Sequence, residues 1–304
     1  MALAVVTFGP DREGPLQILN MLTPTVGVLL LLLVVTPDGY HRAAWAGLAL
    51  HRPGWRAWPL ALIAPTAILC VSYGVAWLVG VLSWNFESDM LINLIITIVI
   101  NSVFAIFEEI GWRGYLLPHF GSPGSFGAAL LAGFLHGVWH LPLMLMTTAY
   151  NPAGNRLITV PIFLAVLTGA GVIYAYLRWT SGSIWPVIIA HGTFNAVLGS
   201  FARAAVTPDA SAAAYLTGET GLFTLAGVGV TAFVLARRYP SVRSAESDER
   251  QPRSSERLHD LTGFGPNGAR SSPDFAMQRL ACRHLWLSEG EHVRLGAGLE
   301  ERDL

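Results

Sequence analysis

The chain has 304 residues, of which 53% are hydrophobic and only 13% are charged. A soluble domain carries roughly 25% charged residues, so this composition excludes an ordinary water-soluble enzyme for most of the chain. The net charge of −1 also excludes the basic footprint of a nucleic-acid-binding protein. The charges are unevenly spread: residues 238–304 hold 10 Arg and 11 Asp or Glu, whereas residues 1–237 hold 9 Arg and 9 Asp or Glu.

Long uncharged stretches run through residues 1–237, and the stretch 114–155 alone contains 42 residues without a charge. A helix needs about 20 apolar residues to cross a bilayer, and in lipid its backbone polar groups must be satisfied internally. We therefore predict an all-α, polytopic bundle, with residues 1–237 as one multi-span membrane domain. In chain order, the seven predicted spans are residues 15–36, 57–83, 90–118, 125–148, 157–177, 183–202 and 219–236.

Residues 238–304 are rich in Arg, Ser, Glu, Gly and Pro and show no sustained periodicity, which predicts a disordered cytoplasmic tail. If the N-terminus lies outside, the inner connections hold six arginines and the outer segments hold three. The positive-inside rule favours this orientation. We expect a multi-pass protein of a bacterial cell membrane with its C-terminus in the cytoplasm.

Three charged residues, Glu108, Glu109 and Arg113, lie inside the third predicted span. Each costs about 2.5–3.5 kcal/mol at the centre of a membrane helix on insertion scales. Glu109 and Arg113 are four residues apart, so they share a helix face and can pair as a structural support. Glu108 lies about 100° around the helix from Glu109, so we expect its partners on other helices. A buried ion-pair network that only fixes packing would explain Glu109 and Arg113 better than Glu108.

Two further spans carry paired polar residues at helical spacing. The fourth contains His136 and His140, and the sixth contains His191 and Asn195. Each pair is four residues apart and therefore lies on one helix face. At about 1.5 Å per residue, Glu108 and both pairs fall in one layer of the membrane under the predicted topology. His136 taken alone is read more readily as a core residue than as a functional one.

This set of side chains suits the hydrolysis of an amide bond by water. A carboxylate in a low-dielectric site beside an imidazole is a competent general base, which points to Glu108 and His140. His191 and Asn195 would supply hydrogen-bond donors for the oxyanion. His136 and His140 also have the spacing of a zinc pair, which His191 and Glu108 would complete. From the residues alone, the zinc-dependent and the metal-free versions both stay open.

The motifs resemble those of the CAAX prenyl protease and bacteriocin-processing family of intramembrane proteases, also called the Abi family. Glu108-Glu109-x-x-x-Arg113 followed by Gly-Tyr-Leu-Leu-Pro is similar to the first motif of that family. Trp139-His140-Leu-Pro is similar to the end of the second motif. Ser181-Gly-Ser-Ile-Trp-Pro with His191-Gly-Thr-Phe-Asn195 is similar to the third. The resemblance covers about residues 100–200, and it departs at His136, where the second motif usually has Phe.

The resemblance implies an intramembrane endopeptidase, of the metallo or the glutamate type, in which Glu108 and His140 activate water. It implies that His191 and Asn195 hold the oxyanion, and that Glu109 and Arg113 form the structural pair. The expected partners are membrane lipid and a membrane-associated or lipidated protein or peptide. The alternative is a non-catalytic scaffold or bacteriocin-immunity protein with the same fold. Haem ligation by His140 and His191 is least favoured, because it leaves the charged residues of the third span without a role.

Overall fold

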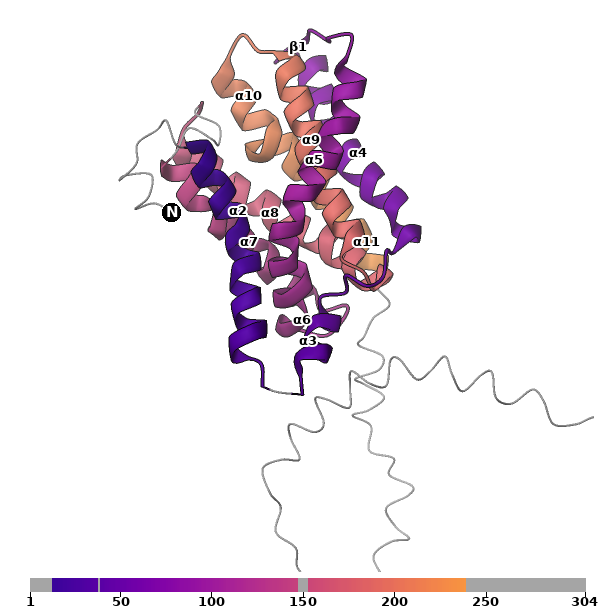
Figure 1. Cartoon of the computed structure of the whole chain (residues 1–304). Coiled ribbons are helices and arrows are strands. Elements are labelled where there is room, and N and C mark those ends of the chain that lie inside the picture. The colour runs from indigo at the N-terminus through magenta and orange to yellow at the C-terminus, as the bar shows by residue number, and fades with distance from the viewer. Residues whose placement is uncertain (1–12, 38, 147–152, 239–304) are drawn as a thin grey trace, which may run out of the picture. The chain divides into compact units, whose positions relative to one another are not determined.

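The computed structural model describes residues 13–37, 39–146 and 153–238, with side chains from residue 17 onward. The predicted tail at 238–304 lies outside these residues apart from Arg238, which ends the last helix. The described elements, shown in Figure 1, are α2 (Glu13–Leu30), η2 (Leu31–Val35), α3 (His41–Gly47), η3 (Trp55–Ala57), α4 (Trp58–Leu78), β1 (Ser83–Trp84), α5 (Met90–Glu109), η4 (Ile110–Leu116), α6 (Leu117–Phe120), α7 (Phe126–Met146), α8 (Arg156–Ser181), α9 (Trp185–Ala204), β2 (Ala205–Val206), α10 (Ala210–Leu216), η5 (Gly218–Thr220) and α11 (Leu222–Arg238).

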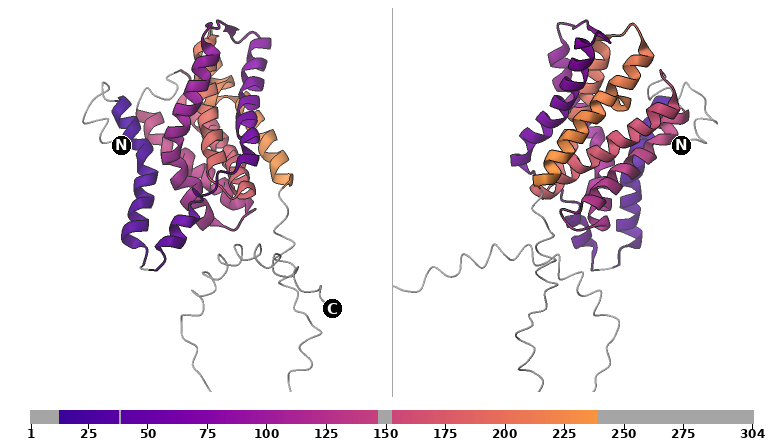
Figure 2. Two further views of the ribbon diagram at one scale, coloured as in Figure 1. Left: turned by 45° about the vertical axis from the view of Figure 1, so that its right-hand side comes forward. Right: turned by 180° about the vertical axis from the view of Figure 1, so that it is seen from behind.

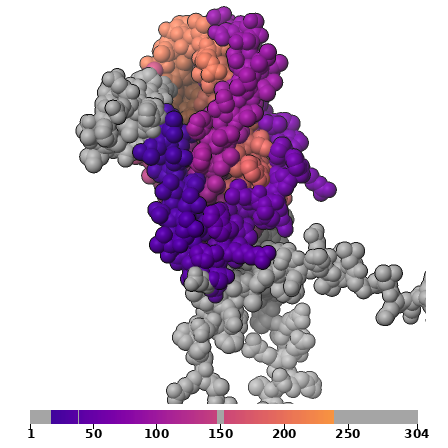
Figure 3. Space-filling view, in the orientation of Figure 1, coloured from indigo at the N-terminus to yellow at the C-terminus, as the bar shows by residue number. Residues whose placement is uncertain are grey.

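The fold is all-α, as predicted, and its long helices have apolar outer faces. On α5, seven large aliphatic side chains point outward and are exposed, which suits contact with lipid rather than water. In the space-filling view, α2 and α5 cover one face of the molecule, and orange residues show beside the upper part of α5 (Figure 3). The exposed side chains of α5 are Leu91, Ile92, Ile95, Ile96, Val99, Ile100 and Val103.

The expected count of seven spans is not confirmed. Among the described residues, five helical segments are long and apolar enough to cross a membrane, and α9 and α11 do not meet both conditions. The sequence of α9 includes His191, Asn195 and Arg203, which make the helix more polar, and α11 has only 17 residues. The five segments, which support a multi-pass membrane protein, are Gln17–Val35, Trp55–Leu78, Met90–Phe120, Phe126–Met146 and Arg156–Ser181.

Among the long helices of the bundle shown in Figure 2, glycines allow close crossings between α7 and α8 and between α5 and α9. Where α7 meets α8, a Cβ added to Gly133 would lie 2.6 Å from the carbonyl oxygen of Leu167 and 2.9 Å from Cα of Gly171. Where α5 meets α9, a Cβ on Gly192 would lie 2.5 Å from the backbone nitrogen of Ser102. These backbones approach more closely than any larger residue would permit, as is common at helix interfaces in membranes.

The helix ends follow local sequence signals. The Asn155 side chain caps α8 by accepting from the backbone N–H of Leu157 at 2.9 Å, and Gly182 ends the helix with φ of +62°. The predicted second span was expected to reach residue 83, but α4 ends at Leu78, and Gly80 follows with φ of +76°. The short strands β1 and β2 then pair in antiparallel fashion, so that the connection between α4 and α5 lies beside the end of α9.

Candidate active site

The end of α5 and the following turn η4 supply three charged side chains to the interior of the bundle. Glu108 and Glu109 are the last two residues of α5, and Arg113 lies in the π-helical turn η4 that follows. All three are buried, at 1%, 0% and 0% exposure. Single π-helical turns within α-helices often occur at functional sites. Here the turn lies where α2 approaches closely, because a Cβ on Gly111 would fall 2.5 Å from Cβ of Pro24.

Glu109 connects Arg113 to the sixth predicted span. One terminal nitrogen of Arg113, NH1, donates to both carboxylate oxygens of Glu109, at 2.9 and 3.0 Å. The Oε1 atom of Glu109 also lies 2.8 Å from Nδ1 of His191 on α9. The predicted pair of Glu109 and Arg113 is therefore present in the structure, and the same carboxylate fixes the orientation of the His191 ring.

His136 connects Arg113 to Glu108. Its Nδ1 lies 3.1 Å from NH1 of Arg113, and its Nε2 lies 2.9 Å from Oε2 of Glu108. Because a guanidinium can only donate, Nδ1 must accept. The proton of a neutral imidazole is then on Nε2, which donates it to Glu108. The partner that Glu108 lacks within its own segment comes from α7, and it is His136 rather than His140 that makes the shorter contact.

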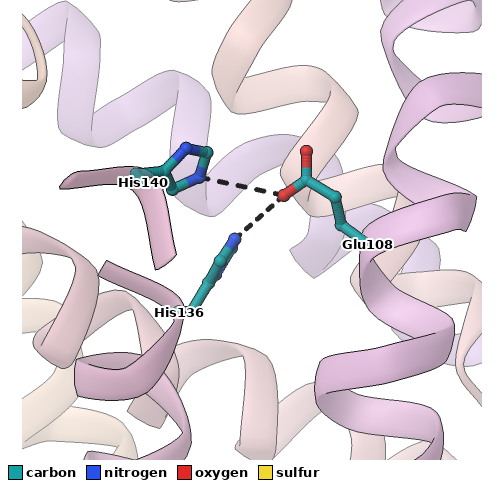
Figure 4. A group of neighbouring side chains, drawn as sticks. All are labelled: Glu108, His136 and His140. Atoms are coloured by element: carbon teal, nitrogen blue, oxygen red, sulfur yellow. Dashed lines mark hydrogen bonds and ion pairs between the residues drawn. The ribbon is translucent and has the colours of Figure 1, made fainter. Parts of the chain in front are cut away.

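His140, one turn further along α7, faces the same carboxylate oxygen (Figure 4). Its Nε2 lies 3.8 Å from Oε2 of Glu108, within ion-pair range but too far for a direct hydrogen bond. Glu108, His136 and His140 each offer one ligand atom, and these atoms all lie within 4.8 Å of one another. The cluster thus has the side-chain types and spacing of a metal site. This group does not include His191, the fourth ligand expected for zinc.

The cluster opens into a cavity of about 720 Å³. Its walls include Glu108, His136, His140, His191 and Asn195, so it joins the residues of all three motifs. Ala205, Thr207 and Ala210 also line it, which means that the cavity extends toward the end of the bundle where β2 and α10 lie (Figure 1). The Asn195 side chain is half-buried in this wall and forms no hydrogen bond with the residues that the structure describes.

Sequence reasoning missed two features of the cavity. Tyr174 of α8 lines it, although its place near the end of the predicted span at 157–177 is typical of an aromatic residue at the membrane interface. Glu219 also lines it, from the turn η5. A single acidic residue at the start of a predicted span gives no sign of which cavity it faces, so only the packing of η5 on α8 reveals it.

Comparison with known proteins identifies a family over this region. Residues 87–197 match the family model described as type II CAAX prenyl endopeptidase Rce1-like. The matched segment contains the first, second and third motifs, and so it confirms the resemblance found in the sequence. It indicates a protease, and therefore a hydrolase, in a membrane context. No curated protein matches the chain.

Proposed function

We propose that this protein is an intramembrane endopeptidase in which Glu108 acts as the general base and His140 helps to hold the attacking water. The observation that carries the proposal is the placement of a buried carboxylate opposite two imidazoles in the wall of a cavity inside the bundle. A water molecule within reach of Oε2 of Glu108 and Nε2 of His140 would give its proton to the carboxylate and attack the carbonyl carbon.

The remaining roles follow from the other wall of the cavity. The Asn195 amide forms no hydrogen bond within the described part of the chain, so its N–H groups can serve a substrate. His191 donates through Nδ1 to Glu109, and its imidazolium form, which that carboxylate favours, also donates through Nε2. Both can stabilise the negative charge that develops on the carbonyl oxygen. Glu108, protonated by the water, would then return the proton to the leaving nitrogen as the C–N bond breaks. Glu109 and Arg113 support these groups without touching the substrate.

The hydrogen bonds support the metal-free version of this reaction. Zinc needs unprotonated imidazole nitrogens and, in catalytic sites, three protein ligands. Nε2 of His136 carries the proton that is donated to Glu108, because Nδ1 accepts from Arg113. Because His136 is engaged in this way, only Glu108 and His140 of the three-residue group remain available as zinc ligands. The donor set as hydrogen-bonded therefore does not fit a zinc ion, and we assign the glutamate type of mechanism.

The family match suggests a lipidated substrate, and the expected orientation belongs to the same proposal. The matching family is described as a prenyl endopeptidase, so a prenylated peptide is the first substrate to test. Arg52 and Arg56 lie in or near η3, and Arg178 lies at the end of α8, next to the start of α9, whereas β2 and α10 follow the other end of α9. With that end in the cytoplasm, the cavity extends toward the outer side of the membrane.

A cleavage assay tests the proposal on purified protein in detergent, with an internally quenched farnesylated peptide that ends in a Cys-aliphatic-aliphatic-X sequence. Glu108→Gln keeps the side-chain size and an acceptor for His136, and we expect it to lower kcat by about 10²–10⁴-fold, the usual contribution of a general base. Glu87→Gln, an exposed glutamate before α5, is the matched control and should retain the wild-type rate.

The same assay separates the alternatives. Cleavage by Glu108→Gln at the wild-type rate would contradict the role of Glu108. Loss of wild-type activity in a chelator, with recovery on adding Zn²⁺, would contradict the metal-free mechanism alone. A wild-type protein that binds the peptide without cutting it would instead support the non-catalytic scaffold or immunity protein.

A further inference from the structure

Tyr174 is a buried residue of the cavity that the reaction described above leaves unused. It is 6% exposed and lies on α8, a helix that carries none of the three motifs' acidic or histidine side chains. It lines the same cavity as Glu108, His140, His191 and Asn195. A polar group in this position needs either a partner or a function.

The hydroxyl of Tyr174 has no hydrogen-bond partner among the residues that the structure describes, since its contacts are through the ring. In the described part of the chain, the Tyr174 hydroxyl oxygen is not one of the fully buried side-chain atoms that lack a hydrogen-bond partner. The small exposed part of this side chain therefore includes the hydroxyl oxygen, which faces the cavity. A phenol group in a cavity wall can donate one hydrogen bond to a bound molecule.

The ring of Tyr174 is held firmly by the network around the active site. Cζ of Arg113 lies over the ring, 4.8 Å from its centroid. The imidazole of His191 stacks on it with a centroid distance of 5.9 Å and an interplanar angle of 23°. The tyrosine is therefore positioned by the cation that organises the site and by the histidine assigned to the oxyanion. Such a fixed donor costs little reorganisation when charge develops on a substrate.

We propose that the Tyr174 hydroxyl donates a hydrogen bond to the oxygen of the reacting carbonyl, as a third donor beside His191 and Asn195. The inference rests on the proposed peptide hydrolysis. Tyrosine keeps its proton throughout, so the bond-making and bond-breaking steps are unchanged. The donor strengthens its interaction as the carbonyl oxygen becomes an oxyanion, and its effect is therefore larger on kcat than on KM.

Tyr174→Phe tests this role because it removes one oxygen and keeps the ring against Arg113 and His191. With the farnesylated peptide, we expect kcat to fall by about 10²-fold, at the low end of the effect of removing one oxyanion donor, while KM stays within about 2-fold of wild type. Tyr176→Phe, two residues along α8 and outside the cavity wall, is the matched control and should keep the wild-type kcat. A Tyr174→Phe kcat equal to that of wild type overturns the proposal.

A binding measurement keeps this test independent of turnover. A farnesylated peptide with a phosphinate in place of the scissile amide carries a tetrahedral anion, whereas the amide peptide has a neutral carbonyl. We expect Tyr174→Phe to weaken binding of the phosphinate by about 10-fold or more and to leave binding of the amide unchanged. Equal weakening of both would indicate a packing role and overturn the proposal. If the wild-type protein cuts the peptide but the wild-type and Tyr174→Phe proteins bind the phosphinate equally, the role proposed for the Tyr174 hydroxyl is wrong. The proposed function would then still stand. A wild-type chain that neither cuts nor prefers the phosphinate contradicts both.

Discussion

The buried pair of Glu109 and Arg113 makes a quantitative prediction about stability. Both side chains are 0% exposed, and NH1 of Arg113 makes three hydrogen bonds, two to Glu109 and one to His136. Arg113→Leu removes all three and leaves the Glu109 carboxylate buried, with His191 as its remaining hydrogen-bond partner in the described part of the chain. Removing one member of a buried ion pair costs about 3–5 kcal/mol, since the other charge stays desolvated. We expect the free energy of unfolding to fall by that amount.

The double variant Glu109→Leu/Arg113→Leu should recover part of this loss. Nε and NH2 of Arg113 are buried without a hydrogen-bond partner in the described part of the chain, so the native pair carries an uncompensated desolvation cost. Replacing both charges with apolar side chains removes that cost, and we expect the double variant to be more stable than Arg113→Leu by about 2 kcal/mol. It should nevertheless be inactive, because His191 loses the acceptor that orients its ring.

Unfolding of the purified protein in mixed micelles measures these free energies, and the peptide assay measures activity. Arg203→Leu, at an exposed arginine of α9, is the control and should change stability by less than about 0.5 kcal/mol. Two results would refute the reasoning. One is a cost below about 1 kcal/mol for Arg113→Leu, and the other is a double variant that is less stable than the single one.

Two further predictions concern packing and pH. Gly192→Ala places a Cβ 2.6 Å from Cα of Ser102. This substitution should lower the free energy of unfolding by about 1–3 kcal/mol and reduce kcat, because it forces α5 and α9 apart. A Cβ at Gly74 meets nothing within 4 Å, so the control Gly74→Ala should be neutral or stabilising in thermal unfolding. Burial raises the pKa of the Glu219 carboxyl from 4.5 to about 7, so the contribution of Glu219 to the free energy of unfolding is fully present below about pH 4.5 and should fall by about 1–3 kcal/mol as pH rises through about 7. Glu219→Gln should remove most of this dependence of the free energy of unfolding on pH, whereas the exposed control Glu87→Gln should keep it. An unchanged dependence in Glu219→Gln would contradict its assignment to Glu219.

The sequence allowed the helices to be predicted well because their signal is local. The predicted spans at 90–118 and 125–148 correspond to Met90–Phe120 and Phe126–Met146 in the structure. The count of seven spans is not confirmed, because α9 and α11 do not meet the conditions of length and hydropathy among the described residues. The segment that carries His191 and Asn195 is helical, but its polar side chains bring it below the hydropathy of a typical membrane span. A helix buried among other helices does not need a wholly apolar surface.

Contacts between helices were only partly predictable. The pairing of Glu109 with Arg113 follows from a spacing of four residues and is present at 2.9 Å. The partner of Glu108 could be predicted to lie on another helix, but two histidines on one face of α7 were available. Arg113 decides between them, because it holds Nδ1 of His136 and turns Nε2 toward Glu108. Which histidine pairs with Glu108 therefore depends on a contact among three residues from two helices. The periodicity of the sequence does not predict such a contact.

Arg113 therefore organises both sides of the proposed active site. Through Glu109 it orients His191, the proposed oxyanion donor, and through His136 it orients Glu108, the proposed general base. It also lies over the ring of Tyr174. Burying a cation carries a large desolvation cost, and apolar side chains would pack η4 against α7 without that cost. We infer that its contribution is orientation: one guanidinium sets the proposed base and the proposed oxyanion donors in a fixed relation before any substrate arrives.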